Sequence, residues 1–206
     1  MAREDWYRNK EWNSIIAEAF SAKLKRARDK PQYLRIQASY LTEKYPTISL
    51  DLLDQYFALG EHFDHSQASV DRAEAYIALG QIDNAVAAYE AALAYEAVRT
   101  NVLTQAYLSL PFLVATKQLS KHYVRAVEIL NKHKDRLMFP VDRFKWFTAQ
   151  SLIASISGRP AEAAEFARNA VVFSKETHSG FRYHPSIGLV GNEYDLLIKQ
   201  LARVAA

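Results

Sequence analysis

The residues best suited to chemistry lie in one segment, SGFRYHPSIGLVG, residues 179–191. Arg182 could bind a carboxylate or phosphate through its forked guanidinium, and His184 could transfer a proton near neutral pH. Catalysis would also need a second acid or base and a pocket that excludes water, and neither can be assigned from the sequence. The other reading is a strap that packs against the fold through Phe181, Tyr183, Ile187, Leu189 and Val190.

Two histidines beside carboxylates, His62 and His65 in EHFDHSQ, could share a metal ion. Asp64 and Gln67, however, have the spacing of a helix N-cap and its capping-box partner. No further ligand can be assigned from elsewhere in the chain. We therefore expect no metal and no cofactor.

A basic run could contact phosphate groups. It consists of Lys23, Lys25, Arg26, Arg28, Lys30 and Arg35. Basic side chains are also favoured in the last turn of any helix by its dipole, and no base-stacking aromatics alternate with them here. We therefore do not expect a nucleic-acid partner.

Composition indicates an all-α chain. Half of the 206 residues are hydrophobic, and only 6 glycines and 6 prolines interrupt a sequence rich in helix-forming residues. The chain has no cysteine, which excludes disulfides and thiolate chemistry, and no apolar run long enough to span a membrane. We expect a cytoplasmic protein without a membrane partner.

Charge is distributed unevenly along the chain. Residues 43–96 carry ten acidic and two basic residues, a net charge of −8, whereas the rest of the chain has a net charge of +11. Ordinary solvated helix faces would explain this. A bipolar surface that orients a charged partner or forms a homo-oligomer is the alternative.

An internal repeat indicates which elements hold these residues. The stretch AYIALGQIDNAVAAYEAALAYEA, residues 75–97, matches residues 153–175 after a shift of 78 positions. In both, a glycine is followed by alanines five and twelve residues later, which is typical of a helix ending at a tight turn and a second helix packing closely on it. These residues are Gly80, Ala85 and Ala92, and then Gly158, Ala163 and Ala170.

This pattern resembles the tetratricopeptide repeat, a helix–turn–helix unit of about 34 residues. The family motif positions are occupied here by Tyr76, Ala85, Tyr89 and Ala92. The sequence departs from the motif's Trp, Leu, Gly and Pro at Ser69, Arg72, Ala73 and Ala97. The resemblance implies a right-handed α-solenoid in which the first helix of each pair lines a concave groove.

Two weaker copies bring the array to about four tetratricopeptide-like helix pairs. They are anchored at Ser49 and Ala126, and we expect Pro111 to kink the first helix of the third pair. A single domain of three parts is predicted. An N-terminal capping helix lies within 1–29, the array within 30–176, and a Gly/aromatic loop with a short closing helix, capped by Asn192, within 177–206.

The resemblance implies a non-catalytic scaffold that binds a protein or peptide in the concave groove. The aligned groove candidates are Arg35, Ala38, Val70, Glu74, Ile77, Lys145, Thr148 and Leu152, and the loop adds Arg182 and His184. The family's peptide-carboxylate clamp is missing at these positions, so a chaperone tail is not the expected ligand. Two alternatives stay open: a small-molecule enzyme or ligand-binding protein that uses Arg182 and His184, and an RNA-binding solenoid.

Overall fold

The computed structural model describes residues 5–206. In this part of the chain the regular structure consists of ten α-helices and three short 3-10 turns, without a strand, so the prediction of an all-α protein is confirmed. The chain divides into two compact units, Met1–Ala106 and Tyr107–Ala206, and each has a hydrophobic cluster of its own. No helix among the described residues is both long and apolar enough to cross a bilayer.

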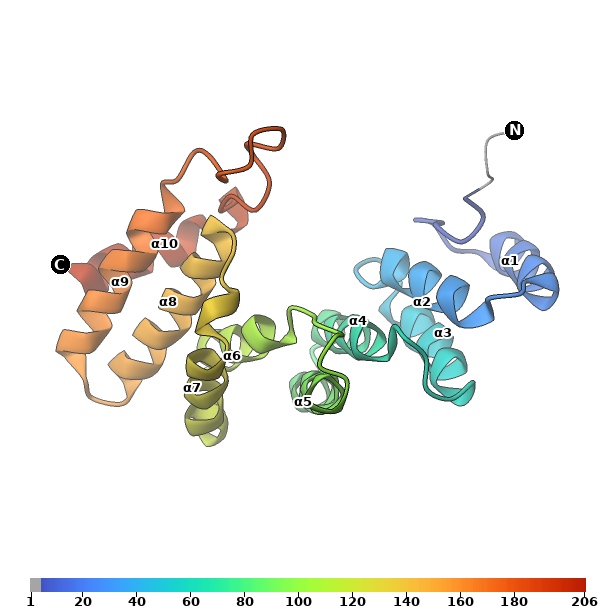
Figure 1. Ribbon diagram of the computed structural model, residues 1–206, viewed down its shortest axis with the longest axis horizontal. Coiled ribbons are helices and arrows are strands. Elements are labelled where there is room, and N and C mark those ends of the chain that lie inside the picture. Colours follow the sequence, from blue (N-terminus) through green and yellow to red (C-terminus); the bar gives the residue numbers. More distant parts are fainter. Residues whose placement is uncertain (1–4) are drawn as a thin grey trace. The chain divides into compact units, whose positions relative to one another are not determined.

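Helices in the first unit pack against their neighbours in the sequence (Figure 1). They are α1 (Ser14–Arg26), α2 (Lys30–Leu41), α3 (Pro46–Ala58), α4 (His65–Ala78) and α5 (Ile82–Val98). Helices α2 and α3 form one closely packed pair, and α4 and α5 form a second. Helix α3 also packs on α4, so the two pairs are joined.

The second unit contains a third closely packed pair. Its helices are α6 (Ala106–Thr116), which starts at the unit boundary, α7 (Tyr123–Lys132), α8 (Pro140–Ile156), α9 (Pro160–Ser174) and α10 (Asp195–Ala205). Helices α8 and α9 form the pair, and α10 packs on α9 through a cluster that includes Phe144 and Leu201. A 3-10 turn, Asn192–Tyr194, precedes α10, so the expectation that Asn192 caps the closing helix is wrong.

The two strong repeat copies have the predicted turns and close helix contacts. Gly80 and Gly158 both adopt a φ of +72°, a left-handed conformation that a residue with a Cβ atom seldom adopts. The four repeat alanines are at most 1% exposed: Ala85, Ala92, Ala163 and Ala170. Their small side chains let α5 approach α4 and let α9 approach α8.

Local sequence signals explain most helix starts. Prolines occupy the first positions of α3, α8 and α9. At this position a backbone N–H group would have no partner within the helix, so proline, which lacks it, loses no hydrogen bond. The side chain of Asn13 accepts a hydrogen bond from the backbone N–H of Ile16 and caps α1. Asp64 precedes α4 as predicted, but its carboxylate accepts from Arg35 instead of capping the helix, so the capping box is wrong.

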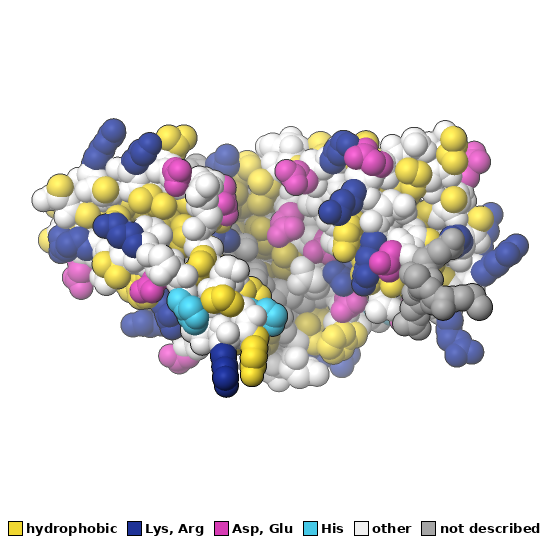
Figure 2. Space-filling view, turned by 90° about the horizontal axis from the view of Figure 1, so that it is seen from above, with side chains coloured by type: hydrophobic (Ala, Val, Ile, Leu, Met, Phe, Trp, Pro, Cys, Tyr) yellow, Lys and Arg dark blue, Asp and Glu magenta, His cyan; other side chains and the backbone are white. Residues whose placement is uncertain are grey.

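An N-terminal segment before α1 is fixed to the first unit by a buried amide. The Gln37 side chain, fully buried, accepts a hydrogen bond from the backbone N–H of Asn9 and donates one to its carbonyl. Next to it, the Trp6 ring lies 5.3 Å from the ring of Phe20 in the core. On the face that Figure 2 shows, basic and acidic side chains are interspersed.

Candidate binding groove

Two adjoining hollows lie along α4 and α5 in the first unit, and together we call them the α4–α5 groove. Their cavity volumes are about 370 and 520 Å³. His65 and Ala91 line both hollows, so the two are continuous. The first is otherwise lined by Phe57, Ser69, Arg72, Tyr76, Asn84, Ala87 and Ala88, and the second by Glu61, Ala94, Tyr95, Val98 and Arg99.

The α5 side of the groove is a stripe of small apolar residues. Ala87, Ala91, Ala94 and Val98 are exposed and follow one another at intervals of four, three and four residues. This spacing keeps them on one face of the helix, while Ala85 and Ala92 on another face are buried against α4. Helix α5 therefore presents small residues on two faces, and only one of them is covered.

Three aromatic rings, from α3, α4 and α5, also line the groove. The His65 ring lies 4.9 Å from that of Tyr95, tilted by 30°, and 4.9 Å from that of Phe57, almost perpendicular to it. The Tyr95 hydroxyl donates to the carbonyl of His62, which fixes the loop before α4. Burial lowers the pKa of His65, which favours its neutral imidazole. Its Nδ1 atom is buried without a hydrogen-bond partner in the described part of the chain.

The basic side chains of the groove are paired with carboxylates. The Arg72 guanidinium lies 3.9 Å from the centre of the Phe57 ring and forms an ion pair with Asp54. At the end near Val98, Arg99 lies 3.9 Å from a carboxylate oxygen of Glu61. Both acids are largely exposed, with side-chain exposures of 72% and 65%. The rim of the groove therefore presents paired charges of both signs to solvent.

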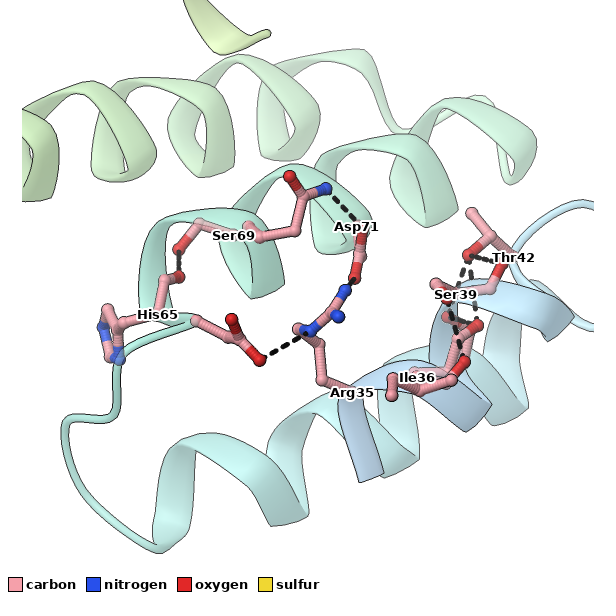
Figure 3. A network of polar contacts seen from close by, with 11 residues as sticks. Arg35, Ile36, Ser39, Thr42, His65, Ser69 and Asp71 are labelled. Atoms are coloured by element: carbon pink, nitrogen blue, oxygen red, sulfur yellow. Dashed lines mark hydrogen bonds and ion pairs between the residues drawn. The ribbon is translucent and has the colours of Figure 1, made fainter. Parts of the chain in front are cut away.

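On another face of α4, a polar network holds α2 and α4 together (Figure 3). The Arg35 guanidinium donates to Asp64 and to Asp71, both at 3.3 Å, and Gln67 donates to Asp71 at 2.9 Å. Burial raises the pKa of Asp71, while the hydrogen bond from Gln67 and the charge of Arg35 act in the opposite direction. The network stabilises the carboxylate and fixes the arginine.

The candidate groove residues on the first helices of the pairs differ in exposure. Arg35 is bound within the network, and Ala38 is fully buried. On α4, Val70 is only 3% exposed, Ile77 is half-buried and Glu74 is exposed. At 100° per residue, these three point about 150° away from the residues of α4 that line the groove. Ala38 and Val70 therefore offer no surface to a partner.

The candidates of α8 are also mostly internal. Thr148 is fully buried, and its hydroxyl has no hydrogen-bond partner among the described residues; Leu152 is 8% exposed. The Lys145 ammonium lies 5.7 Å from the centre of the Phe112 ring and 5.8 Å from that of Tyr194. The repeat alignment places each residue to within one position of the motif. A shift of one position along a helix turns a side chain by 100°. Thr148 and Leu152 are therefore core residues.

Residues 179–191 form a loop that closes on itself and on the start of α8. The backbone N–H of Ser179 donates to the carbonyl of Pro185 at 2.8 Å, and that of Val141 donates to the carbonyl of Gly188 at 2.9 Å. Gly188 has a φ of +66°, and a Cβ atom there would lie 2.4 Å from the Phe139 ring. The Phe181 ring also lies 5.4 Å from the Phe139 ring, so the loop contacts the start of α8 through backbone, glycine and one aromatic side chain.

The side chains of this loop are mostly outside the packed surface. Phe181, Tyr183 and Ile187 are 42%, 79% and 49% exposed, so these three do not pack as the expected strap. Leu189 and Val190 are half-buried, and Val190 packs on the hydrophobic cluster of the second unit. Arg182 and His184 are exposed as well, and the guanidinium lies 5.4 Å from the neighbouring Tyr183 ring. Where the loop protrudes in Figure 2, histidine, basic and hydrophobic side chains lie together. A solvent-exposed arrangement of this kind does not desolvate a catalytic base.

The other two candidate clusters do not form a site with the groove. Residues 5–206 contain no group of three or more histidine or acidic residues that could hold a metal ion, so His62 and His65 have no third ligand there. The basic run from Lys23 to Lys30 lies at the junction of α1 and α2. Its last member, Arg35, is held by Asp64 and Asp71.

No protein-family model, curated protein or solved structure matches the chain. Sequence reasoning missed the groove because it assigned the binding surface through the repeat alignment. A usable signal was present, since Ala87, Ala91, Ala94 and Val98 have the spacing of a helix-packing seam.

Proposed function

We propose that this chain is a tetratricopeptide-like, right-handed α-solenoid that acts as a non-catalytic scaffold and binds a protein or peptide in the α4–α5 groove. The observation that carries the proposal is the exposed stripe of Ala87, Ala91, Ala94 and Val98 in a groove that three aromatic rings also line. Repeat units bury their apolar faces against their neighbours, so an uncovered apolar face on a central repeat is a candidate contact surface.

The apolar surface extends beyond the groove at one end. Val98 is 80% exposed at the end of α5, and Phe63 is 72% exposed in the loop before α4. The loop is tied to α5 by the hydrogen bond between Tyr95 and His62, which brings the residue after His62 next to this end of the helix. Large exposed apolar side chains beside a hollow are characteristic of protein–protein contact sites.

The two alternative functions have less support. An enzyme using Arg182 and His184 would need a pocket around them, but both are exposed and neither lines the hollows described above. An RNA-binding solenoid would need a basic run continuous with the groove. The two arginines that line the groove, Arg72 and Arg99, are each paired with a carboxylate. The basic run ends away from it in Arg35, whose guanidinium is bound to two carboxylates.

Affinity capture with a matched pair of variants tests the proposal. Ala91→Lys places a long side chain in the middle of the groove, whereas Ala97→Lys adds the same group on the exposed side of α5, about 120° around the helix. Proteins captured by the unmodified chain and by Ala97→Lys should be lost from Ala91→Lys. An identical set of captured proteins for all three chains would contradict the proposal.

A further inference from the structure

We infer that His65 is an acid-sensitive latch: its neutral imidazole holds the loop 59–64 and the start of α4 in place, and protonation releases them. The ring lies where three helices meet. It is 4.9 Å from the Phe57 ring at the end of α3 and 4.9 Å from the Tyr95 ring near the end of α5. The latch is a property of the free chain, so it does not depend on what the groove binds.

The loop before α4 has few ties to the rest of the first unit. None of its residues is buried, and at its end Asp64 is held by Arg35. The carbonyl of His62 accepts hydrogen bonds from the Tyr95 hydroxyl and from the backbone N–H of His65, both at 3.1 Å. The rings of these two donor residues pack on each other, so the loop and the His65 ring are held together. Segments with few buried contacts can open locally without global unfolding.

The packed position of the His65 ring suits a neutral imidazole better than a charged one. Its Nδ1 atom is buried and has no hydrogen-bond partner in the part of the chain that the structure describes. One ring nitrogen of a neutral imidazole can remain a bare acceptor, whereas both nitrogens of an imidazolium are donors. Protonation in place would therefore leave a charged N–H group buried without an acceptor. Moving the ring into water removes this cost.

The charged groups around the ring do not compensate for the added proton. Burial is the largest influence on the pKa of His65 and lowers it, and the nearby His62 and Arg72 lower it further. The charge of Glu61 raises this pKa, but its side chain is 65% exposed and paired with Arg99. The titratable and charged residues facing the ring are Tyr56 from α3, Glu61 and His62 from the loop, Arg72 and Tyr76 from α4, and Tyr95 and Arg99 from α5 and its end.

The direction of the response follows from proton linkage. Because the pKa of His65 in the closed state lies below that of an exposed histidine, about 6.5, the open state takes up the proton more readily. The closed state is fully favoured above about pH 6.5, and the open population rises as the pH falls from there toward the closed-state pKa. One proton limits this rise to about tenfold between about pH 7.5 and 5.5. In the open state His65 leaves both hollows, so acid alters the α4–α5 groove.

Amide hydrogen exchange of the full chain, followed by NMR, tests the latch. In the closed state the amides of His65 and Ala68 donate to the carbonyls of His62 and Asp64. We expect their protection factors, which are corrected for the intrinsic pH dependence of exchange, to fall about three- to tenfold between about pH 7.5 and 5.5. The amide of Ala163, which has the corresponding place in α9, is the internal reference and should change less than about twofold.

Two histidine variants identify the side chain that is responsible. His65→Gln keeps a polar side chain that cannot be charged, so the same change of pH should alter its protection less than about twofold. His62→Gln, in the loop itself, should keep the response of the unmodified chain. A full response in His65→Gln, or a response abolished only in His62→Gln, would overturn the latch.

Titration of the His65 ring resonances gives its pKa without any substitution and decides the question if His65→Gln does not fold. A pKa below about 6.5, together with the loss of protection, is the expected result. A pKa at or above this value would show that Glu61 and stacking on Tyr95 outweigh burial, and it would overturn the latch. A lowered pKa with unchanged protection would overturn it as well. Capture of partners by Ala91→Lys is a separate measurement, so the latch and the proposed function can fail independently.

Discussion

At the scale of single residues, the two faces of α4 have different tasks. One face carries Asp71, which is 3% exposed and held by Arg35 and Gln67, and it joins α4 to α2. The other carries His65 and Arg72, whose side chains line the α4–α5 groove. The first set stabilises the fold, and the second is available to a partner.

Removing the arginine of the network should destabilise the protein. Arg35→Ala leaves the buried Asp71 carboxylate without its cation, and we expect a loss of about 3 kcal/mol in the free energy of unfolding. Arg159→Ala, at an exposed pair with Glu162, serves as the control and should cost less than about 1 kcal/mol. Urea unfolding followed by circular dichroism measures both. Equal losses for the two variants would show that the network contributes no more than a surface ion pair.

Acidification should destabilise the chain partly through His65. Burial lowers the pKa of His65 in the folded state, and the nearby His62 and Arg72 lower it further, whereas the charge of Glu61 raises it. Because the net shift is downward, protonation of His65 favours the unfolded chain. The stabilising effect of neutral His65 is complete above the unfolded value of about 6.5 and is lost as the pH falls toward the folded value.

Variants of two histidines isolate this effect. Between about pH 7.5 and pH 5.5, the melting temperature of His65→Gln should fall less than that of the unmodified chain. His184→Gln, at an exposed side chain of the loop, should follow the unmodified chain. Differential scanning fluorimetry gives the three slopes. Parallel slopes for all three chains would remove His65 as a source of pH dependence.

At the scale of elements, close helix contacts and one glycine-mediated loop contact determine how the helices are held. Helix α5 is packed through Ala85 and Ala92 on one face and leaves Ala87 and Ala91 uncovered on another. The loop 179–191 is attached to the start of α8 by a backbone hydrogen bond, by Gly188 and by the Phe181 ring, which lies 5.4 Å from that of Phe139. Alanine therefore allows close packing on the face of α5 that contacts α4 and leaves a small apolar surface on the exposed face.

Two alanine-to-leucine changes on α5 should have unequal effects. Ala85→Leu overpacks the contact with α4 and should cost about 1–3 kcal/mol of stability. Ala87→Leu adds the same atoms on the exposed face and should change stability by about 0.5 kcal/mol or less. Thermal unfolding of both variants distinguishes them. A tolerated Ala85→Leu would contradict the close approach that the repeat assignment requires.

Two glycine variants test how the loop is held. Gly188→Ala would press a methyl group into the Phe139 ring, whereas Gly180→Ala meets no atom within 4 Å, although both residues have positive φ. Both variants share the backbone strain, so the difference between them reports the ring contact. Amide hydrogen exchange at Val141, whose N–H donates to Gly188, should accelerate only in Gly188→Ala. Equal exchange in the two variants would contradict the attachment described above.

At the scale of the whole molecule, sequence identified the helical class and the strongest repeats. The glycines at 80 and 158 and the small residues that follow them encode turns and close contacts locally, so the pairs α4/α5 and α8/α9 could be predicted. The candidate groove could not, because the direction of a side chain depends on how pairs pack together. Arg35 was assigned to a groove, yet its partners Asp64 and Asp71 lie 29 and 36 residues away.

The burial of side chains in the loop 179–191 could not be predicted from the sequence either. Its glycines predicted an irregular segment, and five of its side chains were expected to be buried because they are apolar. Phe181 and Tyr183 stay largely exposed, while the loop meets the start of α8 at Gly188 and at the ring pair of Phe181 and Phe139, contacts that no local pattern encodes. Apolar side chains on a protruding loop are therefore weak evidence for packing.

The central claim is that partners contact the groove face of the second helix pair, and site-specific photo-crosslinking tests it most directly. A photoreactive residue at position 94 lies in the groove, and one at position 77 lies on the face that the repeat alignment favoured. In cells that express the chain, we predict a discrete crosslinked product from position 94 and none above background from position 77. Crosslinking from position 77 alone would contradict the account and restore the concave face as the binding surface.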